Sequence, residues 1–272
     1  MTEEMRAALL EQIAAAGPQA LAGMLDLEPI EADLFRAAYV FDEPFALYGG
    51  QVLAQSLVAA GRTVDPSRRV HSLHGYFLRP GDALRPTVFQ VFRDRDGRSY
   101  SARRVIAIQR GEVILNMSCS FSTTGSGPVH QDVSMPDISG PRAPLHHLPR
   151  LFSFEIAHAE GASPSAYPPE RFWARCTAEL GDDPLLHAAA LTYVSDISSG
   201  LVRHADDEGS GGSSLDHALW FHEPVRAGAW LLHDLIPQRT GSGRGLYAGH
   251  VFSADGHLVA TLAQETLFGR PR

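Results

Sequence analysis

The sequence predicts an α+β fold made of two tandem copies of one unit, in which an antiparallel sheet wraps around a buried helix. The first observation behind this prediction is an internal repeat, whose matching residues lie 144, 146 and 145 positions apart: Pro80 and Pro224, Val105 and Val251, Gly111 and Gly256. An offset this constant indicates a duplicated unit. The second observation is that each copy holds one helix that is apolar nearly all round, followed by four strand-like runs. Such a helix must be buried, and a sheet folded around it would bury it.

The first copy opens with three segments that have helical patterns. Residues 2–16 are expected to form an amphipathic helix that ends at Gly17-Pro18, because glycine and proline stop a helix. A second helix is expected at residues 31–38. The third, residues 51–60 after the pair Gly49-Gly50, has no polar face, so it is the helix that we expect to be buried.

Four strands are expected after the buried helix of the first copy, at residues 70–78, 87–93, 100–109 and 113–121. Turn residues separate these runs. The second copy repeats the order. Its helix is expected at residues 185–195, where Asp183 can cap the first turn and Pro184 suits the first helical position. Its strands are expected at residues 215–221, 230–236, 245–253 and 258–268.

Between the two copies the chain becomes rich in glycine, proline, serine and histidine, which is typical of a linker. We therefore divide the chain into an N-terminal unit with the extra helix (residues 1–122), a linker (123–150) and a C-terminal unit (151–272). The second unit also contains a longer loop, residues 198–213. This loop is either a solvated connection or a lid over an active site.

The composition disfavours several classes of protein. Of the 272 residues, 44% are hydrophobic and 20% are charged, which fits a soluble protein with a full core. A formal charge of −8 disfavours a nucleic-acid binder. No apolar run approaches the roughly 20 residues that span a bilayer, and the acidic start, Thr2-Glu3-Glu4, disfavours a signal peptide. Cys119 and Cys176 offer no disulfide framework, so a cytoplasmic location is expected.

Several short segments carry a resemblance to one enzyme family. They are YGGQV (48–52), HSLHGYFLRPGD (71–82), DGRSYSARRV (96–105), YVSD (193–196), LDHALWFH (215–222) and AQE (263–265). In this order the chain, from Leu25 to Phe268, resembles the type II acyl-CoA thioesterases. The resemblance implies the fold called a double hotdog, in which each of two antiparallel sheets wraps around one helix. It also implies hydrolysis of acyl-CoA to a free fatty acid and CoA.

The resemblance further implies a catalytic trio of Asp, Thr or Ser, and Gln, all from the second copy. In this chain the three roles fall on Asp196, Ser214 and Gln264. Many relatives have Thr in place of Ser214, so the hydroxyl is retained. Ser213 is the alternative, because a slip of one residue along a strand reverses the direction of a side chain. In the first copy Cys119 stands 145 positions before Gln264, so one active site per chain is expected.

The chemistry of these side chains suits hydrolysis by water. Asp196 ends an apolar helix, where a partly desolvated carboxylate can act as a general base. Ser214 can donate one hydrogen bond and accept another, and the Gln264 carbonyl can accept from the water. No Gly-x-Ser-x-Gly motif occurs, so we expect direct attack of water without an acyl-enzyme. Backbone N–H groups at Gly49 and Gly50 are candidates for binding the oxyanion.

An arginine cluster gives a weaker signal for substrate binding. Its members on this acidic chain are Arg93, Arg95, Arg98, Arg103 and Arg104. One interpretation is that they recognise the CoA phosphates, with Arg98 and Arg104 as the favoured contacts, because arginine binds phosphate in a bidentate manner. The other is that they solvate a hairpin in a chain that contains no lysine.

The remaining expectations concern His74, cofactors and partners. His74 lies either beside the substrate channel or in the core. Metal-ligand motifs such as His-Glu-x-x-His are absent, so neither a metal nor an organic cofactor is expected. Acyl-CoA is the expected partner, and a homodimer or homotetramer is expected because hotdog sheets have edges to cover. The alternative function is a non-catalytic acyl-CoA-binding protein with the same fold.

Overall fold

The computed structural model describes most of the chain between residues 17 and 268. The described residues are 17, 20–37, 46–123, 125, 127–142, 145–146, 151, 153–160, 169–197, 200–201 and 211–268. The helix expected at residues 2–16 therefore lies outside the described residues.

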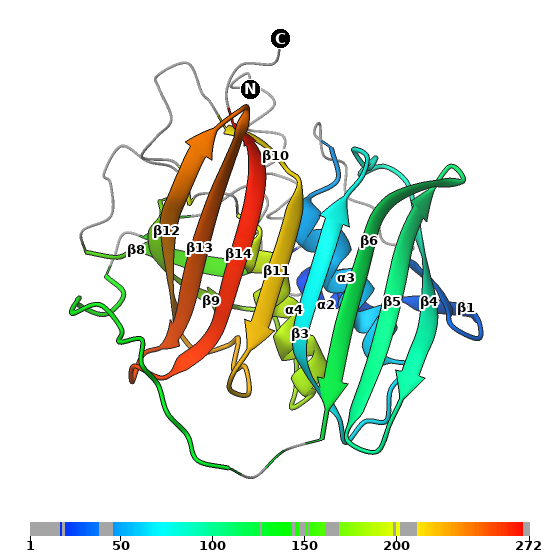
Figure 1. Ribbon diagram of the computed structural model, residues 1–272, viewed down its shortest axis with the longest axis horizontal. Coiled ribbons are helices and arrows are strands. Elements are labelled where there is room, and N and C mark those ends of the chain that lie inside the picture. Colours follow the sequence, from blue (N-terminus) through cyan, green and yellow to red (C-terminus); the bar gives the residue numbers. More distant parts are fainter. Residues whose placement is uncertain are drawn as a thin grey trace.

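The described strands form one sheet of 14 antiparallel strands, whose central strands lie in front of the helices in Figure 1. The first copy contributes β1 (Glu28–Glu31), β2 (Leu34–Ala37), β3 (Arg69–Phe77), β4 (Thr87–Asp96), β5 (Tyr100–Gln109) and β6 (Glu112–Ser122). The second contributes β7 (Leu145–His146), β8 (Phe154–His158), β9 (Arg171–Cys176), β10 (Gly211–Ser214), β11 (Asp216–Phe221), β12 (Leu231–Gly241), β13 (Arg244–Ser253) and β14 (Leu258–Phe268).

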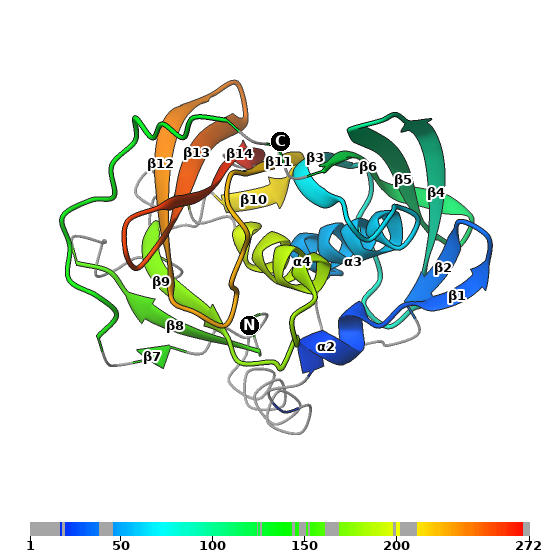
Figure 2. The same ribbon diagram turned by 90° about the horizontal axis from the view of Figure 1, so that it is seen from below.

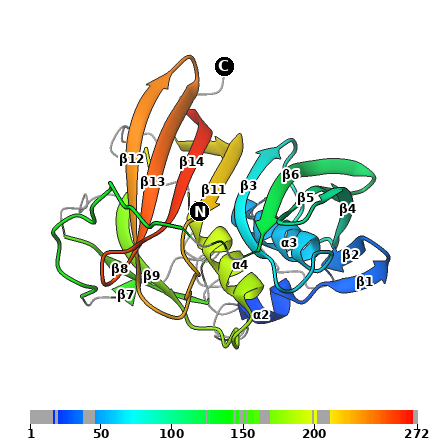
Figure 3. The ribbon, with the colours of Figure 1, turned by 60° about the horizontal axis from the view of Figure 1, so that its bottom comes forward.

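The order of the central strands in one half of the sheet mirrors the order in the other half, which confirms the duplication. From one edge to the centre the order is β1-β2-β4-β5-β6-β3, and from the centre outward it is β11-β14-β13-β12-β9-β8-β7, with β10 paired to β14. The two halves join where β3 and β11 pair, from Ser72–Trp220 to Tyr76–Asp216. The predicted architecture is therefore confirmed. In Figure 3 the sheet of each half curves around its own helix.

The two central helices, α3 (Gly49–Gly61) and α4 (Pro184–Ser195), lie side by side inside the sheet in Figure 2. A short helix, α2 (Ala20–Leu25), packs beside them. In α3 every residue from Gly50 to Ala60 is buried, as its apolar circumference predicts. The predicted cap of α4 is also confirmed, because the Asp183 carboxylate accepts the Leu185 N–H at 2.9 Å.

Glycines let α3 and α4 pack closely and antiparallel. A Cβ on Gly50 would lie 2.2 Å from the Tyr193 carbonyl oxygen, and one on Gly61 would lie 2.5 Å from the Leu185 side chain. Near the same crossing, the Tyr48 hydroxyl donates to the Tyr193 carbonyl at 2.9 Å. The start of α3 therefore meets the end of α4. This contact places the residue that follows α4 at the positive end of the α3 dipole.

The helix predicted at residues 31–38 is wrong. Strands β1 and β2 form a hairpin there, whose turn contains Asp33 at φ 60°, a conformation that aspartate tolerates better than most residues. The burial of Phe35 and Ala37 alternates with the exposure of Arg36, which is a strand period. The pattern was too short to distinguish a helix from a strand.

The part of the linker between residues 127 and 142 packs along the outside of the second copy. Val133, Met135 and Ile138 cover a cluster that includes Trp173 and Phe252. The Gln131 side chain accepts the Leu258 N–H and donates to the Gly256 carbonyl. The division at residues 122 and 150 stays a prediction. None of the helices described between residues 17 and 268 combines the length and apolar character of a bilayer-spanning segment.

Candidate active site

The three residues assigned to catalysis come together in the structure. The Ser214 hydroxyl donates to Asp196 Oδ1 at 3.0 Å, and the Gln264 amide nitrogen donates to Ser214 Oγ at 2.6 Å. Gln264 is fully buried and Asp196 is only 3% exposed. The three side chains therefore form a short hydrogen-bonded chain that ends on a desolvated carboxylate, which must be hydrogen-bonded to stay charged.

Each member of this trio is positioned by a different element. Asp196 is the C-terminal cap of α4, and Ser214 is the last residue of β10, where it pairs with Thr266. Gln264 is on β14, on the face that points toward the helices, between the exposed or half-buried Ala263 and Glu265. Ser213 is exposed. Of the two candidate hydroxyls, it is Ser214 that contacts Asp196.

A bend between β10 and β11 positions Ser214 beside Gln264. The Leu215 N–H donates to the Glu265 carbonyl at 2.8 Å, and the Asp216 Oδ1 accepts the Glu265 N–H at 2.8 Å. These two bonds fasten the bend to the residue that follows Gln264. The backbones of Ser214 and Gln264 are therefore held in register beside each other.

The start of α3 faces the carboxylate. A Cβ on Gly49 would lie 2.3 Å from Asp196 Oδ2 and 2.8 Å from the Phe77 ring, so only glycine allows the carboxylate to approach the helix so closely. The N–H groups of a first helical turn have no acceptor within the helix, and they carry the positive end of the dipole. The positive end of α3 stabilises the charged Asp196 carboxylate. It thereby opposes the negative end of α4, which Asp196 caps and which destabilises that charge.

His217 belongs to the same network, although it was not predicted as a site residue. Its Nδ1 lies 2.5 Å from Gln264 Oε1, and its Nε2 lies 2.9 Å from Ser195 Oγ. Burial lowers the pKa of His217 to about 4, although the hydrogen bond with Gln264 opposes that shift. The Gln264 carbonyl oxygen contacts the imidazole, and a carbonyl oxygen can accept two hydrogen bonds, so its expected hydrogen bond from water stays a prediction.

The first copy lacks this machinery at the equivalent positions. Cys119 occupies the strand position of Gln264, and burial raises the pKa of its thiol to about 12. Arg62 caps α3 as Asp196 caps α4, and its guanidinium donates to the Leu27 carbonyl. A cation at the C-terminal end of a helix is favourable. At the C-terminal cap of its helix, the first copy has a stabilising cation where the second copy has an acid. This difference agrees with the prediction of one site per chain.

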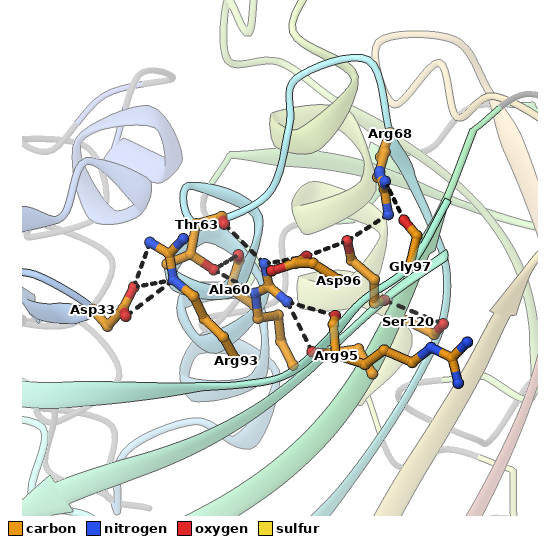
Figure 4. Close-up of polar contacts among 12 residues, drawn as sticks. Asp33, Ala60, Thr63, Arg68, Arg93, Arg95, Asp96, Gly97 and Ser120 are labelled. Carbon is orange, nitrogen blue, oxygen red and sulfur yellow. Dashed lines mark hydrogen bonds and ion pairs between the residues drawn. The ribbon is translucent and has the colours of Figure 1, made fainter. Parts of the chain in front are cut away.

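Two of the five arginines of the cluster, Arg93 and Arg103, have a structural role. Arg103 is 1% exposed, and it donates to Thr63, to Asp96 and to the Arg95 carbonyl. Arg93 makes a bidentate ion pair with Asp33 (Figure 4). The burial of Arg103 argues against its recognition of CoA phosphates, whereas for the exposed Arg93 that interpretation stays a prediction.

Arg98 and Arg104 do not meet the trio either. Arg98 lies in the turn between β4 and β5, beside the end of β3 that begins at Arg69, whereas Gly49 contacts Phe77 at the other end of that strand. A strand of this length is roughly 26 Å long. Arg104 stands between two buried residues of β5, so it points from the outer face, where it covers the Phe92 ring at 4.1 Å. The prediction that these two residues bind phosphate finds no support in this geometry.

His74 also lies on the outer face. Its Nε2 is 3.0 Å from Asp216 Oδ2, and its side chain is 44% exposed. The expectation that His74 lies in the core is therefore wrong. His74 lies on the face of the sheet opposite to the trio. Through Asp216, His74 supports the bend that carries Ser214.

Two further expectations have limited structural tests. Of the loop at residues 198–213, only residues 200–201 and 211–213 are described, so the choice between a lid and a solvated loop lies outside the described residues. Among the residues whose placement is described, no group of three or more His, Cys, Asp or Glu side chains could share a metal ion.

Comparison with known proteins identifies relatives along nearly the whole chain. The family model of the acyl-CoA thioesterase N-terminal domain matches residues 41–122, and that of the acyl-CoA thioesterase C-terminal domain matches residues 130–268. Human acyl-coenzyme A thioesterase 8 is 34% identical, over 89% of this chain and 86% of that protein. Acyl-CoA thioesterase 2 of Haemophilus influenzae is 32% identical, over 90% of this chain and 95% of that protein.

Solved structures give the same picture. Acyl-CoA thioesterase II TesB2 from Mycobacterium marinum superimposes with a TM-score of 0.79 at 41% identity, covering 93% of this chain and 98% of that one. The tesB protein of Mycobacterium avium subspecies paratuberculosis gives 0.80 at 30% identity, covering 92% and 98%. A binding protein without turnover, the alternative considered from the sequence, finds no support among these relatives.

Proposed function

This chain belongs to the acyl-CoA thioesterase family and hydrolyses acyl-CoA, and we propose that it does so by direct attack of a water molecule that Asp196 deprotonates. The observation that carries the proposal is the placement of the Asp196 carboxylate. It is nearly excluded from solvent, receives the Ser214 hydrogen bond, and faces the positive end of α3. A base held in this way can take a proton and return it without leaving its place.

The reaction balances with Asp196 as the only proton carrier. The water oxygen forms a bond to the thioester carbon while one water proton passes to Asp196, and the carbonyl oxygen becomes an oxyanion. When the carbon–sulfur bond breaks, its electron pair goes to sulfur, and Asp196 returns the proton to it. The products are the CoA thiol and a fatty acid.

The developing oxyanion would be received by backbone N–H groups of Gly49 and Gly50. These groups begin α3 beside Asp196, and the first turn of a helix offers donors without intrahelical acceptors. Donors that are already oriented stabilise the transition state more than the ground state. Ser214 and Gln264 hold the carboxylate in its direction of attack.

Replacement of Ser214 by Ala tests this assignment. The variant is expected to lose about 10- to 100-fold in kcat, because the buried Asp196 loses a hydrogen bond from a neutral donor. Thiol release from short, medium and long acyl-CoAs measures the loss and gives the chain-length range. Intact-protein mass spectrometry during turnover should show no acyl group attached to the protein.

Ser213→Ala is the matched control, since Ser213 is exposed and next in sequence. It should keep the activity of the unchanged protein. Equal losses in both variants would reject Ser214 as the active hydroxyl, and an acylated protein would reject direct attack by water.

We further propose that the protein works in the cytoplasm as a homodimer or homotetramer. Both cysteines are free and buried, as suits a reducing compartment. On the outer face of the sheet, Tyr76 is 50% exposed and Trp220 is 44% exposed, and exposed aromatic side chains are typical of interfaces. Light scattering should give a mass of two or four chains, and a single chain at micromolar concentration would reject the proposal.

A further inference from the structure

We propose that His217 is a positioning residue for the hydrolysis, whose Nδ1–H holds the Gln264 amide in the only orientation that reserves the Ser214 proton for Asp196. This inference rests on the proposed roles of the trio. It adds a fourth side chain, which touches neither the substrate nor the water and acts through Gln264.

His217 extends the hydrogen-bonded chain of the trio from Gln264 back to Ser195. It lies on β11 with its side chain pointing toward the helices, and it is fully buried. One ring nitrogen contacts Gln264 at 2.5 Å, and the other contacts Ser195 at 2.9 Å. Ser195 directly precedes Asp196 in the chain. The imidazole therefore bridges the end of α4 to β14, the two elements that must keep a fixed separation for the site to form.

The direction of the hydrogen bonds follows from the charge at one end. The Ser214 hydroxyl has a single proton, and the carboxylate of Asp196, 3.0 Å away, is the acceptor that gains most from it. The contact between Ser214 and Gln264 must then be donated by the amide nitrogen of Gln264. This turns the amide oxygen toward His217.

A carbonyl oxygen 2.5 Å from a ring nitrogen needs a proton between them, so Nδ1 must carry it. His217 is neutral at physiological pH, because burial lowers the pKa of His217 to about 4. It therefore has one ring proton, and Nε2 is left as an acceptor. The Ser195 hydroxyl, which can donate either to His217 or to the Thr192 carbonyl, must donate to His217.

All four hydrogen bonds of this chain then have the same donor-to-acceptor direction. They run from Ser195 to His217, to Gln264, to Ser214 and finally to Asp196. The opposite tautomer, with the proton on Nε2, would require the Gln264 amide to turn over. Its oxygen would then face Ser214 and take the proton that Asp196 needs. The tautomer of His217 thus decides whether the base is correctly hydrogen-bonded.

The tautomer can be measured directly on the unchanged protein. In a sample labelled with ¹⁵N-histidine, the two ring nitrogens of a neutral imidazole have well separated chemical shifts that identify the protonated one. The signal of His217 is assigned as the one that disappears in His217→Asn. We expect a protonated Nδ1 and a bare Nε2 at pH 7. A protonated Nε2 with a bare Nδ1 would overturn the proposal.

Three substitutions separate positioning from a structural role. In His217→Asn the amide nitrogen can occupy the place of Nδ1, in His217→Gln it reaches only the place of Nε2, and His217→Leu has no donor. We expect His217→Leu and His217→Gln to lose about 10- to 1000-fold in kcat with little change in KM, and His217→Asn to recover at least about tenfold of that loss.

His233→Leu is the control for loss of a buried histidine. His233 is 1% exposed, and neither of its ring nitrogens has a hydrogen-bond partner among the described residues, so its replacement should leave kcat unchanged. Full activity of a folded His217→Leu would overturn this inference alone, provided that Asp196→Asn is inactive. An active Asp196→Asn would overturn the proposed function instead. If His217→Leu does not fold, the tautomer measurement still decides.

Discussion

An Asp196→Asn variant is expected to hydrolyse acyl-CoA about 10³ times more slowly than the unchanged protein, because an amide cannot take a proton from water. The substitution keeps the size of the side chain, and an amide oxygen can still accept from Ser214. The interaction that is lost exists only in the transition state. The effect should therefore appear in kcat, with little change in KM.

The fold should tolerate this change. The negative end of α4 disfavours the Asp196 carboxylate, whereas the positive end of α3 favours it, so removal of the charge acts on stability in opposite directions. We expect the unfolding temperature to change little. A large drop would mean that the carboxylate is mainly structural.

Asp183→Asn is the matched control, because it makes the same substitution at the other end of the same helix. Asn caps a helix about as well as Asp, so both stability and kcat should be close to those of the unchanged protein. Thiol release under saturating acyl-CoA measures both variants. Turnover of Asp196→Asn within a few-fold of the control would remove Asp196 from the mechanism.

The duplicated architecture could be predicted because its signals are local and occur twice. A helix that is apolar all round, as α3 is, has only one stable environment. Turn residues delimit the strands, so β5 and β14 were predicted with the bounds that the structure gives them. The repeat offset then relates the two halves without any knowledge of long-range contacts.

The edges of the sheet could not be predicted in the same way. Strands β1, β2, β8 and β9 are short, and β2 was predicted as part of a helix. Four to six residues contain too few periods to distinguish 3.6 from 2. What makes these segments strands is the exposed edge beside them, which the sequence does not display.

Part of the candidate site could likewise be predicted, and part could not. The trio was placed through family resemblance, but His217 was missed although a signal existed. In LDHALWF, alternation puts His217, Leu219 and Phe221 on one face of the strand. Two apolar members predict that this face is buried, and a buried histidine must be hydrogen-bonded or neutral. A polar residue at a core position of a strand was the signal to follow.

Arg103 shows the opposite error. It was grouped with its sequence neighbours as a basic cluster, yet the same alternation puts it on the inner face with Val105, and Arg104 on the outer face. Sequence proximity on a strand does not imply proximity of side chains. The arginine is buried because Thr63 and Asp96 satisfy its donors.

The second large effect is expected on stability in acid, and His233 should account for much of it. Its ring stacks on Phe172 at 4.7 Å in the core. Burial lowers the pKa of His233 from 6.5 to about 3, and that of His217 from 6.5 to about 4. Below pH 6.5 these two histidines bind protons in the unfolded chain but remain neutral in the folded chain. The stability from both groups is therefore complete above pH 6.5 and is lost as the pH falls toward 4 and 3.

The size of this loss follows from proton linkage. Each of the two histidines should cost about 1 kcal/mol of unfolding free energy between pH 6.5 and pH 5.5. A His233→Leu variant should remove one of these two contributions. It should also be more stable at pH 7 by about 1 kcal/mol, because two ring nitrogens that have no hydrogen-bond partner in the described part of the chain no longer have to be buried.

Thermal unfolding of both proteins at pH 7.0, 6.0 and 5.5 measures the two effects together. At pH 7.0 the variant should unfold about 2 to 4 °C higher, and this difference should roughly double by pH 5.5. His233→Phe, which keeps the ring stacked on Phe172, should behave in the same way. If the difference between His233→Leu and the unchanged protein stays constant with pH, the folded protein protonates His233 as readily as the unfolded chain does, and the prediction from its burial is wrong.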